Sequence, residues 1–120
     1  PNALSITATE AAYTYGDDWL DALIDVIRQN AVTFSRLLKE AAPKLIITPL
    51  EGTYLCWVDF RAYLAPEETK AFLQDTCSVA VDFGEWFAPN CQGFARFNLA
   101  TDPAIVEDVA RRIGEGLTGR

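Results

Sequence analysis

The stretch Gly93-Phe94-Ala95-Arg96-Phe97-Asn98-Leu99-Ala100 decides how the fold of this chain is interpreted. Apolar residues recur at every second position, which is typical of a β-strand with one buried face. The face that can join a core consists of Gly93, Ala95, Phe97 and Leu99. The opposite face carries Arg96, whose permanent charge and planar set of donors suit a carboxylate ligand. Arg96 is therefore the first candidate binding residue, and a structural arginine paired with a surface carboxylate is the alternative.

Three other segments favour strands. Residues 53–60 are dense in aromatic and β-branched side chains, and residues 45–48 and 79–82 are shorter apolar runs. We expect Gly52 to adopt a positive φ in the turn that precedes residue 53, because glycine reaches that conformation without a steric cost.

Apolar residues at helical spacing predict a long helix at 17–42 and a last helix that begins near Pro103. Capping residues and a first-turn proline predict shorter helices at 5–15 and 66–76. The order of elements is then α-α-β-β-α-β-β-α. This order predicts an α+β fold, in which helices cover one face of a small antiparallel or mixed sheet. Arg96 and Asn98 would lie on the other face of that sheet.

Length and charge narrow the class of protein. The chain has 120 residues, which suits one domain, and a net charge of −7 with a pI of about 4.4. This acidic balance argues against a nucleic-acid partner. No apolar run approaches the roughly 20 residues of a membrane-spanning helix, and no signal peptide is visible. We therefore expect a cytoplasmic protein without a membrane partner.

The residue types present exclude several kinds of catalysis. The chain has no histidine, which removes Ser-His and Cys-His nucleophile pairs and the commonest metal ligand. Its three cysteines have no metal-binding spacing and are expected to be thiols in a reducing compartment. Asp59 and Asp82 could be imagined as an acid/base pair, but nothing else in the sequence supports this role.

Several stretches together resemble the C-terminal small domain of fold-type I pyridoxal-phosphate enzymes (class I/II aminotransferase superfamily), in the MalY/PatB-type cystathionine β-lyase (C-S lyase) branch. Two motifs carry most of the resemblance: Gly-Thr-Tyr-Leu-x-Trp within residues 51–59, and Gly-Phe-x-Arg-x-Asn further along the chain. Together they distinguish this family from others better than either motif alone. The resemblance covers nearly the whole chain, in order. The stretches that carry it are 7–13, 16–23, Asn30, 51–59, Gly84, Phe87, 93–100 and Pro103.

The resemblance implies roles for particular residues. In this family the arginine of the last strand binds the α-carboxylate of the amino-acid substrate, and Arg96 occupies the matching position. Asn98, Gly52 and Tyr54 are expected near the same site. The resemblance also makes residues 17–42 the long interdomain-type helix of the family.

The resemblance further implies that residues 1–120 are a single C-terminal small domain whose large, cofactor-binding domain is absent. The parent enzyme would be a homodimer that uses pyridoxal 5'-phosphate and cleaves cystathionine or cysteine conjugates to a thiol, an α-keto acid and ammonia. The lysine that forms the Schiff base would lie upstream of this chain. The chain alone is therefore expected to hold no catalytic residue or metal, to bind no cofactor and to be inactive.

Two alternatives remain. The small domain of a pyridoxal-phosphate aminotransferase would share Arg96 but would return the amino group to a second keto acid. A stand-alone α+β binding or interaction module would instead fold without exposed apolar surface. The lyase and the aminotransferase interpretations both predict exposed apolar surface, for example on the long helix, where the large domain would sit.

Overall fold

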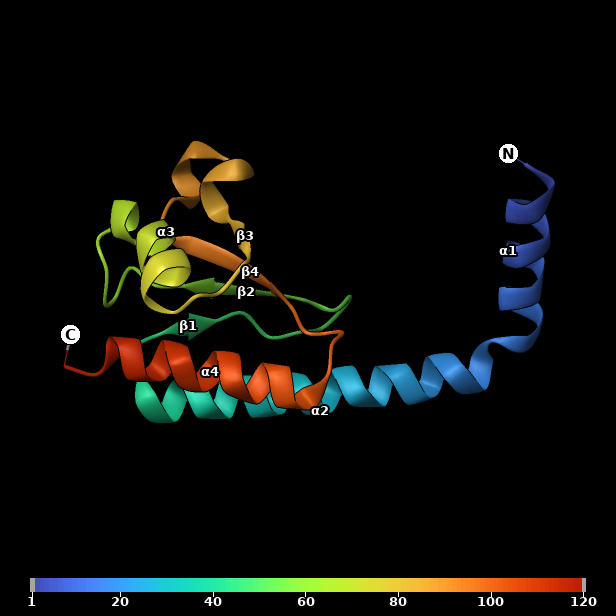
Figure 1. The fold of residues 1–120 in the computed structure, drawn as a ribbon, viewed down its shortest axis with the longest axis horizontal. Helices are drawn as coiled ribbons and strands as arrows, with labels where there is room; N and C mark the ends of the chain where they lie inside the picture. The colour runs from blue at the N-terminus through green and yellow to red at the C-terminus, as the bar shows by residue number, and fades with distance from the viewer. Residues whose placement is uncertain (1, 120) are drawn as a thin grey trace.

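A computed structural model describes residues 2–119 (Figure 1). The helices are α1 (Ala3–Tyr15), α2 (Asp17–Ala41), the short α3 (Thr69–Ala71) and α4 (Pro103–Leu117). The strands are β1 (Ile46–Ile47), β2 (Leu55–Asp59), β3 (Asp82–Phe83) and β4 (Phe94–Asn98). This order confirms the predicted α-α-β-β-α-β-β-α arrangement.

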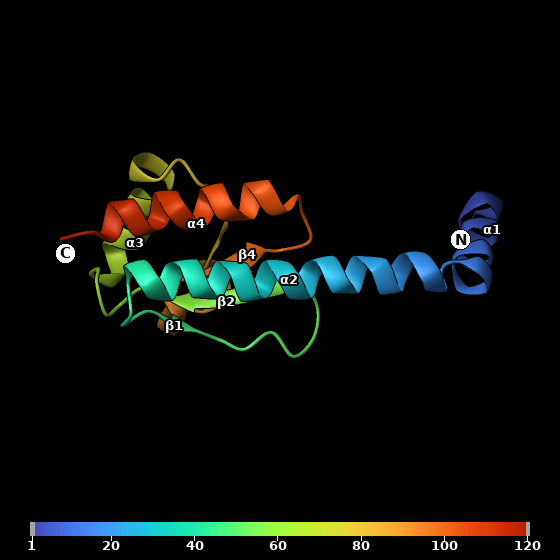
Figure 2. The same cartoon turned by 90° about the horizontal axis from the view of Figure 1, so that it is seen from below.

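The four strands form one antiparallel sheet in the order β1-β2-β4-β3. In its register, Arg96 of β4 is paired with Trp57 of β2 on one side and with Asp82 of β3 on the other. Helices α2 and α4 lie side by side under one face of the sheet (Figure 2). The predicted fold class, an α+β sheet covered on one face by helices, is therefore confirmed.

The core lies between the sheet and these two helices. The apolar face predicted for the stretch 93–100 is buried in it: Ala95, Phe97 and Leu99 are at most 4% exposed. The Phe97 ring lies 5.1 Å from that of Phe34 on α2. The further members of the core include Leu38, Val58, Phe60, Phe72, Leu73, Val106, Ala110 and Ile113.

A buried amide fixes the end of β4 against α2. The side-chain nitrogen of Asn30 donates hydrogen bonds of 2.9 Å to the carbonyl oxygens of Leu99 and Thr101. Asn30 is only 2% exposed. Because these bonds satisfy two carbonyls where the chain leaves β4, they hold the strand that carries Arg96 in place over the long helix.

The N-terminal part of the chain projects from this body (Figures 1 and 2). Helix α1 has no buried residue, and the first buried residue of α2 is Ile27. The radius of gyration is 16.8 Å, whereas a compact chain of this length has about 14 Å. Within residues 2–119, no helix combines the length and apolar character needed to cross a membrane.

Three local expectations differ from the structure. The residue with positive φ before β2 is Thr53 (φ 62°), not Gly52. The strand expected at 79–82 begins only at Asp82. The helix expected at 66–76 is present but changes pitch along its length: a 3-10 turn (Pro66–Glu68) leads into α3, and a π-helical turn (Phe72–Thr76) follows.

Candidate functional site

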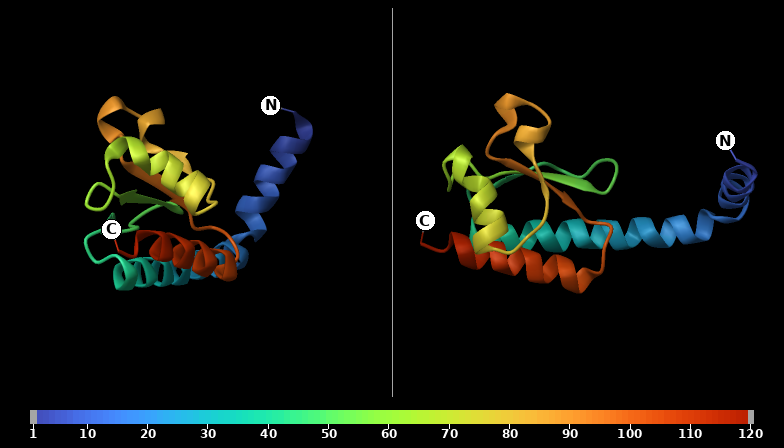
Figure 3. Two further views of the ribbon diagram at one scale, coloured as in Figure 1. Left: turned by 60° about the vertical axis from the view of Figure 1, so that its left-hand side comes forward. Right: turned by 45° about the horizontal axis from the view of Figure 1, so that its top comes forward.

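The sheet face opposite α2 and α4, which we call the open face, carries the polar residues of the central strands. Because side chains alternate along a strand, residues paired across the sheet point to the same side. Arg96, Trp57 and Asp82 therefore share the open face, as do Phe94 and Asp59 one pair further along. The loop between β3 and β4, residues 84–93, lies beyond this face (Figure 3, right).

Arg96 is held by two neighbours on the open face. Its Nε and Nη2 atoms donate hydrogen bonds of 3.1 and 2.7 Å to Oδ2 of Asp82. Its Cζ atom stands 4.5 Å from the centre of the Phe87 ring, within the range of a cation–π contact. The Arg96 side chain is still 32% exposed, so its charge is held in a fixed place and remains within reach of a ligand.

The contact with Asp82 uses only one edge of the guanidinium. An arginine has five N–H donors, and Asp82 takes one from Nε and one from Nη2. Among residues 2–119, no acceptor binds Nη1 of Arg96. The edge formed by Nη1 and the second hydrogen of Nη2 is therefore open, and its geometry matches the two oxygens of a carboxylate.

Aromatic rings connect this arginine to a second one. The Trp57 ring meets Phe87 edge-on at 5.5 Å and stacks on Phe94 at 5.6 Å. Cζ of Arg61 lies 4.3 Å from the centre of the Phe94 ring. We call Arg96, Phe87, Trp57, Phe94 and Arg61 the open-face cluster. Its rings give both guanidinium groups a rigid apolar support.

Arg61 is bound by both carboxylate oxygens of Asp59. Its Nε and Nη2 atoms donate hydrogen bonds of 2.9 and 2.8 Å to the two carboxylate oxygens. The hydrogen bonds from Arg61 lower the pKa of Asp59, although burial acts in the opposite direction. Gly93 makes room for this pair: it has φ 89°, and a Cβ there would lie 2.5 Å from Cγ of Arg61. Asp59 thus holds Arg61 with both oxygens, although Nη1 of Arg61, like that of Arg96, has no acceptor among residues 2–119.

The structure brings only part of the expected site together. Asn98 lies on the open face two residues beyond Arg96, and its Oδ1 accepts a hydrogen bond from the Ala100 amide. Tyr54 lies beside Leu99, whose amide bonds its carbonyl oxygen, and its side chain is exposed. Gly52 lies against α2, in a shallow pocket near Ile27. Within residues 2–119, Tyr54 and Gly52 are thus not part of the open-face cluster.

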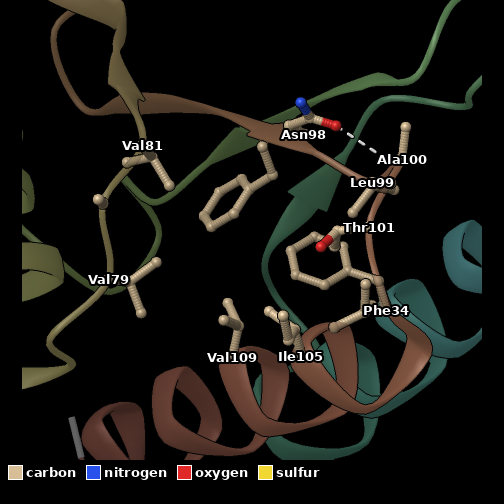
Figure 4. A pocket seen from close by; sticks show the side chains of 12 residues that line it. Phe34, Val79, Val81, Asn98, Leu99, Ala100, Thr101, Ile105 and Val109 are labelled. Atoms are coloured by element: carbon tan, nitrogen blue, oxygen red, sulfur yellow. Dashed lines mark hydrogen bonds between the residues drawn. The ribbon is translucent and has the colours of Figure 1, made fainter.

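A separate cavity lies on the helix side of β4. It has a volume of about 300 Å³, and apolar side chains from the 79–81 segment, α2 and α4 surround it. Figure 4 shows Val79, Val109 and Phe34 pointing into it, with Asn98 at its rim. Because Arg96 points to the opposite side of the sheet, this cavity is distinct from the arginine site.

Residues 2–119 do not bring together the groups that a pyridoxal-phosphate site needs. Of its three lysines, Lys39 donates to the carbonyl oxygen of Leu45, Lys44 follows α2, and Lys70 stands over the Phe83 ring. All three are exposed, and none lies on the strands that carry the open face. The described residues therefore do not by themselves hold pyridoxal phosphate.

The carboxylates of the open face do not form an acid/base pair. Asp59 is bound to Arg61 and Asp82 to Arg96, so each carries its own counter-ion. The thiol of Cys56 is buried on the other face, and burial raises its pKa to about 11. Neither feature supplies a catalytic base or nucleophile.

Sequence reasoning missed Asp82 and Phe87 as partners of Arg96. The signal for Asp82 was its place in a strand that precedes β4, since a hairpin would pair the two strands. Residues 84–93 separate them, however, and this irregular link hides the register. Phe87 was among the residues that carry the family resemblance, but nothing in the sequence linked its ring to Arg96.

Comparison with known proteins supports the resemblance, although no protein-family model matches the chain. PatB of Bacillus subtilis, a cystathionine β-lyase, is 35% identical over 118 residues, which cover 98% of this chain and 30% of PatB. MalY of Escherichia coli is 32% identical over 109 residues, covering 89% of this chain and 28% of MalY. The structure of cystalysin from Treponema denticola, which contains pyridoxal 5'-phosphate, matches with a TM-score of 0.90 and 29% identity, covering 97% of this chain and 30% of that chain.

The fold matches the small domain of a fold-type I pyridoxal-phosphate enzyme. The chain spans about 30% of the length of the curated relatives that it matches. Within that class, it is a C-terminal small domain of the MalY/PatB cystathionine β-lyase type, as the sequence motifs predicted.

Proposed function

We propose that this chain is the substrate-carboxylate-binding domain of a pyridoxal-phosphate C-S β-lyase that cleaves cystathionine or cysteine conjugates. The observation that carries the proposal is the free edge of Arg96 on the open face. Relatives named as cystathionine β-lyases support the reaction class. The products would be a thiol, an α-keto acid and ammonia.

The role of Arg96 would be to orient the amino acid. A carboxylate bound by two parallel N–H···O bonds cannot rotate, so the Cα–H and Cβ–S bonds of the substrate keep a fixed direction. The open-face cluster would support this role, because stacked rings restrict the movement of the guanidinium. The cofactor of the parent enzyme would supply the electron sink that labilises the bonds at Cα.

The remainder of the parent enzyme would cover the projecting helices. Trp19 is 69% exposed and Val32 of the same helix is equally exposed, and Tyr13 and Tyr15 on α1 are more than 80% exposed. A helix of 13 residues without buried side chains is marginally stable in water. This apolar surface favours a domain of a larger enzyme over a stand-alone module. A second subunit, as in the expected homodimer, could share in covering it.

Replacing Arg96 by alanine in the intact parent enzyme tests the proposal. Loss of the charged partner should raise KM for cystathionine by about 30-fold or more, with the cofactor retained and its absorption spectrum unchanged. The matched control is Arg36→Ala, which removes an exposed arginine paired with Glu40 on α2 and should leave KM unchanged. An unchanged KM in Arg96→Ala would refute the carboxylate role.

The reaction class needs a separate assay. The lyase should release thiol without any added keto acid, whereas an aminotransferase would need a keto acid as amino-group acceptor. Thiol release measured with and without 2-oxoglutarate therefore decides between the two reactions. Strict dependence on the keto acid would contradict the proposal.

A further inference from the structure

The geometry points to Asp82 and Phe87 as positioning residues that hold Arg96 so that one edge of its guanidinium faces the substrate carboxylate; this inference rests on the proposed function. A flexible arginine on a wet sheet face would sample many rotamers. Ordering it only when the substrate binds would cost affinity. Two neighbours that order it beforehand remove that cost.

Asp82 acts from the side of the guanidinium. A single oxygen, Oδ2, accepts hydrogen bonds from both Nε and Nη2. These two donors point the same way, along the edge nearest the arginine's own backbone, and the terminal edge points away from it. Asp82 therefore restrains the group without occupying the edge that a substrate would use.

Phe87 acts from the face of the guanidinium. Its ring centre is 4.5 Å from Cζ, and the edge-on contact with Trp57 restrains the ring itself. Contact with one face limits tilting, and contact with one edge limits rotation in the plane. Together the two neighbours restrict both motions of the guanidinium.

The backbone fixes the positions of Asp82 and Phe87 without the help of a ligand. Asp82 is placed opposite Arg96 by the β3–β4 register. Phe87 closes the 3-10 turn Gly84–Trp86 with a 2.9 Å hydrogen bond from its amide to the Gly84 carbonyl. A Cβ on Gly84 would lie 2.0 Å from the Cys91 carbonyl oxygen, so this loop can fold back over the sheet because residue 84 is a glycine.

The test compares Asp82→Ala with Asp82→Asn in the intact parent enzyme. Asparagine keeps an oxygen that can accept from Nε and Nη2 but removes the charge, whereas alanine removes both. For cystathionine we expect KM to rise about tenfold in Asp82→Ala, with kcat little changed, and to stay within about threefold of the parent value in Asp82→Asn. Phe87→Leu keeps an apolar contact but loses the ring, and should raise KM about threefold.

A carboxylate-free probe makes the readout specific. The amine in which hydrogen replaces the α-carboxylate of the same substrate should inhibit wild type and Asp82→Ala with equal inhibition constants. The control Asp108→Ala removes a carboxylate bound to Arg111 and Arg112 on α4 and should leave KM unchanged. Thermal unfolding of each variant records any loss of fold.

Three outcomes would overturn the inference. A lower KM in both Asp82 variants would mean that Asp82 competes with the substrate. An unchanged KM in Asp82→Ala, or an equal loss of affinity for the amine, would mean that it has only a structural role. If Arg96→Ala also leaves KM unchanged, the proposed function itself fails. If Arg96→Ala raises KM and only the Asp82 variants have no effect, the inference about Asp82 fails and the proposed function stands.

Discussion

At the scale of single residues, the two arginines of the open face differ in how their carboxylate partners hold them. Asp59 binds Arg61 through both carboxylate oxygens, whereas Asp82 binds Arg96 through one oxygen at one edge. Both pairs leave the terminal edge of the guanidinium unpaired among residues 2–119, and what sets Arg96 apart is its place on β4 between Trp57 and Asp82.

The Asp59–Arg61 pair should make stability depend on pH. Because the pKa of Asp59 is lower in the folded chain than the usual value of about 3.9, the pair contributes fully above that value. Its contribution is lost as the pH falls through the lower, folded pKa. In urea unfolding between pH 2 and 7, the stability difference between wild type and Asp59→Asn should therefore be constant above about pH 5 and shrink below about pH 4.

The control for this measurement is Asp25→Asn, which alters an exposed pair with Arg28 on α2. Exposed pairs of this kind contribute little, so this variant should follow wild type across the same range. A difference for Asp59→Asn that does not change with pH would contradict the assignment.

At the scale of elements, Asn30 links the long helix to the end of β4. Replacing it by alanine leaves the carbonyl oxygens of Leu99 and Thr101 buried without their donor. We expect the free energy of unfolding in urea to fall by about 3 kcal/mol. The exposed neighbour Gln29 provides the control, because Gln29→Ala should change stability by less than about 0.5 kcal/mol. Equal stability of the two variants would show that the bonds contribute nothing.

The sequence was sufficient for what depends on local pattern. The alternation in 93–100 correctly assigned Ala95, Phe97 and Leu99 to the core and Arg96 to the other face. Helical spacing likewise predicted the long helix to within a residue of Asp17–Ala41. Strand alternation and helical spacing depend on neighbours along the chain, so both can be recognised without knowledge of tertiary contacts.

What depends on distant contacts could not be predicted in this way. The ion pair of Arg96 with Asp82 depends on a register between strands separated by residues 84–93. The positive φ falls at Thr53, whose Oγ1 accepts a hydrogen bond from the Leu55 amide, and not at Gly52. Tyr54 and Gly52 were assigned to the site by resemblance alone, and their role stays a prediction.

At the scale of the whole molecule, the chain divides into a packed body and a projecting arm formed by α1 and the start of α2. Because α1 has no buried residue, deleting residues 1–16 should lower the free energy of unfolding by less than about 0.5 kcal/mol. Ile113→Ala, in the core, should lower it by about 3 kcal/mol in the same urea assay. A large loss on deletion would mean that the arm stabilises the body.

Because one long helix joins the arm to the body, a small change of angle at one end of α2 displaces the other end by several ångströms. Helix α2 has 25 residues and is therefore about 37 Å long, and it has buried side chains only in its second half. With α1 as the fixed end, a rotation of about 10° at the elbow would swing the far end of such a rod by about 6 Å. The direction in which α2 leaves Gly16 would then set where the body that carries Arg96 stands relative to whatever holds α1.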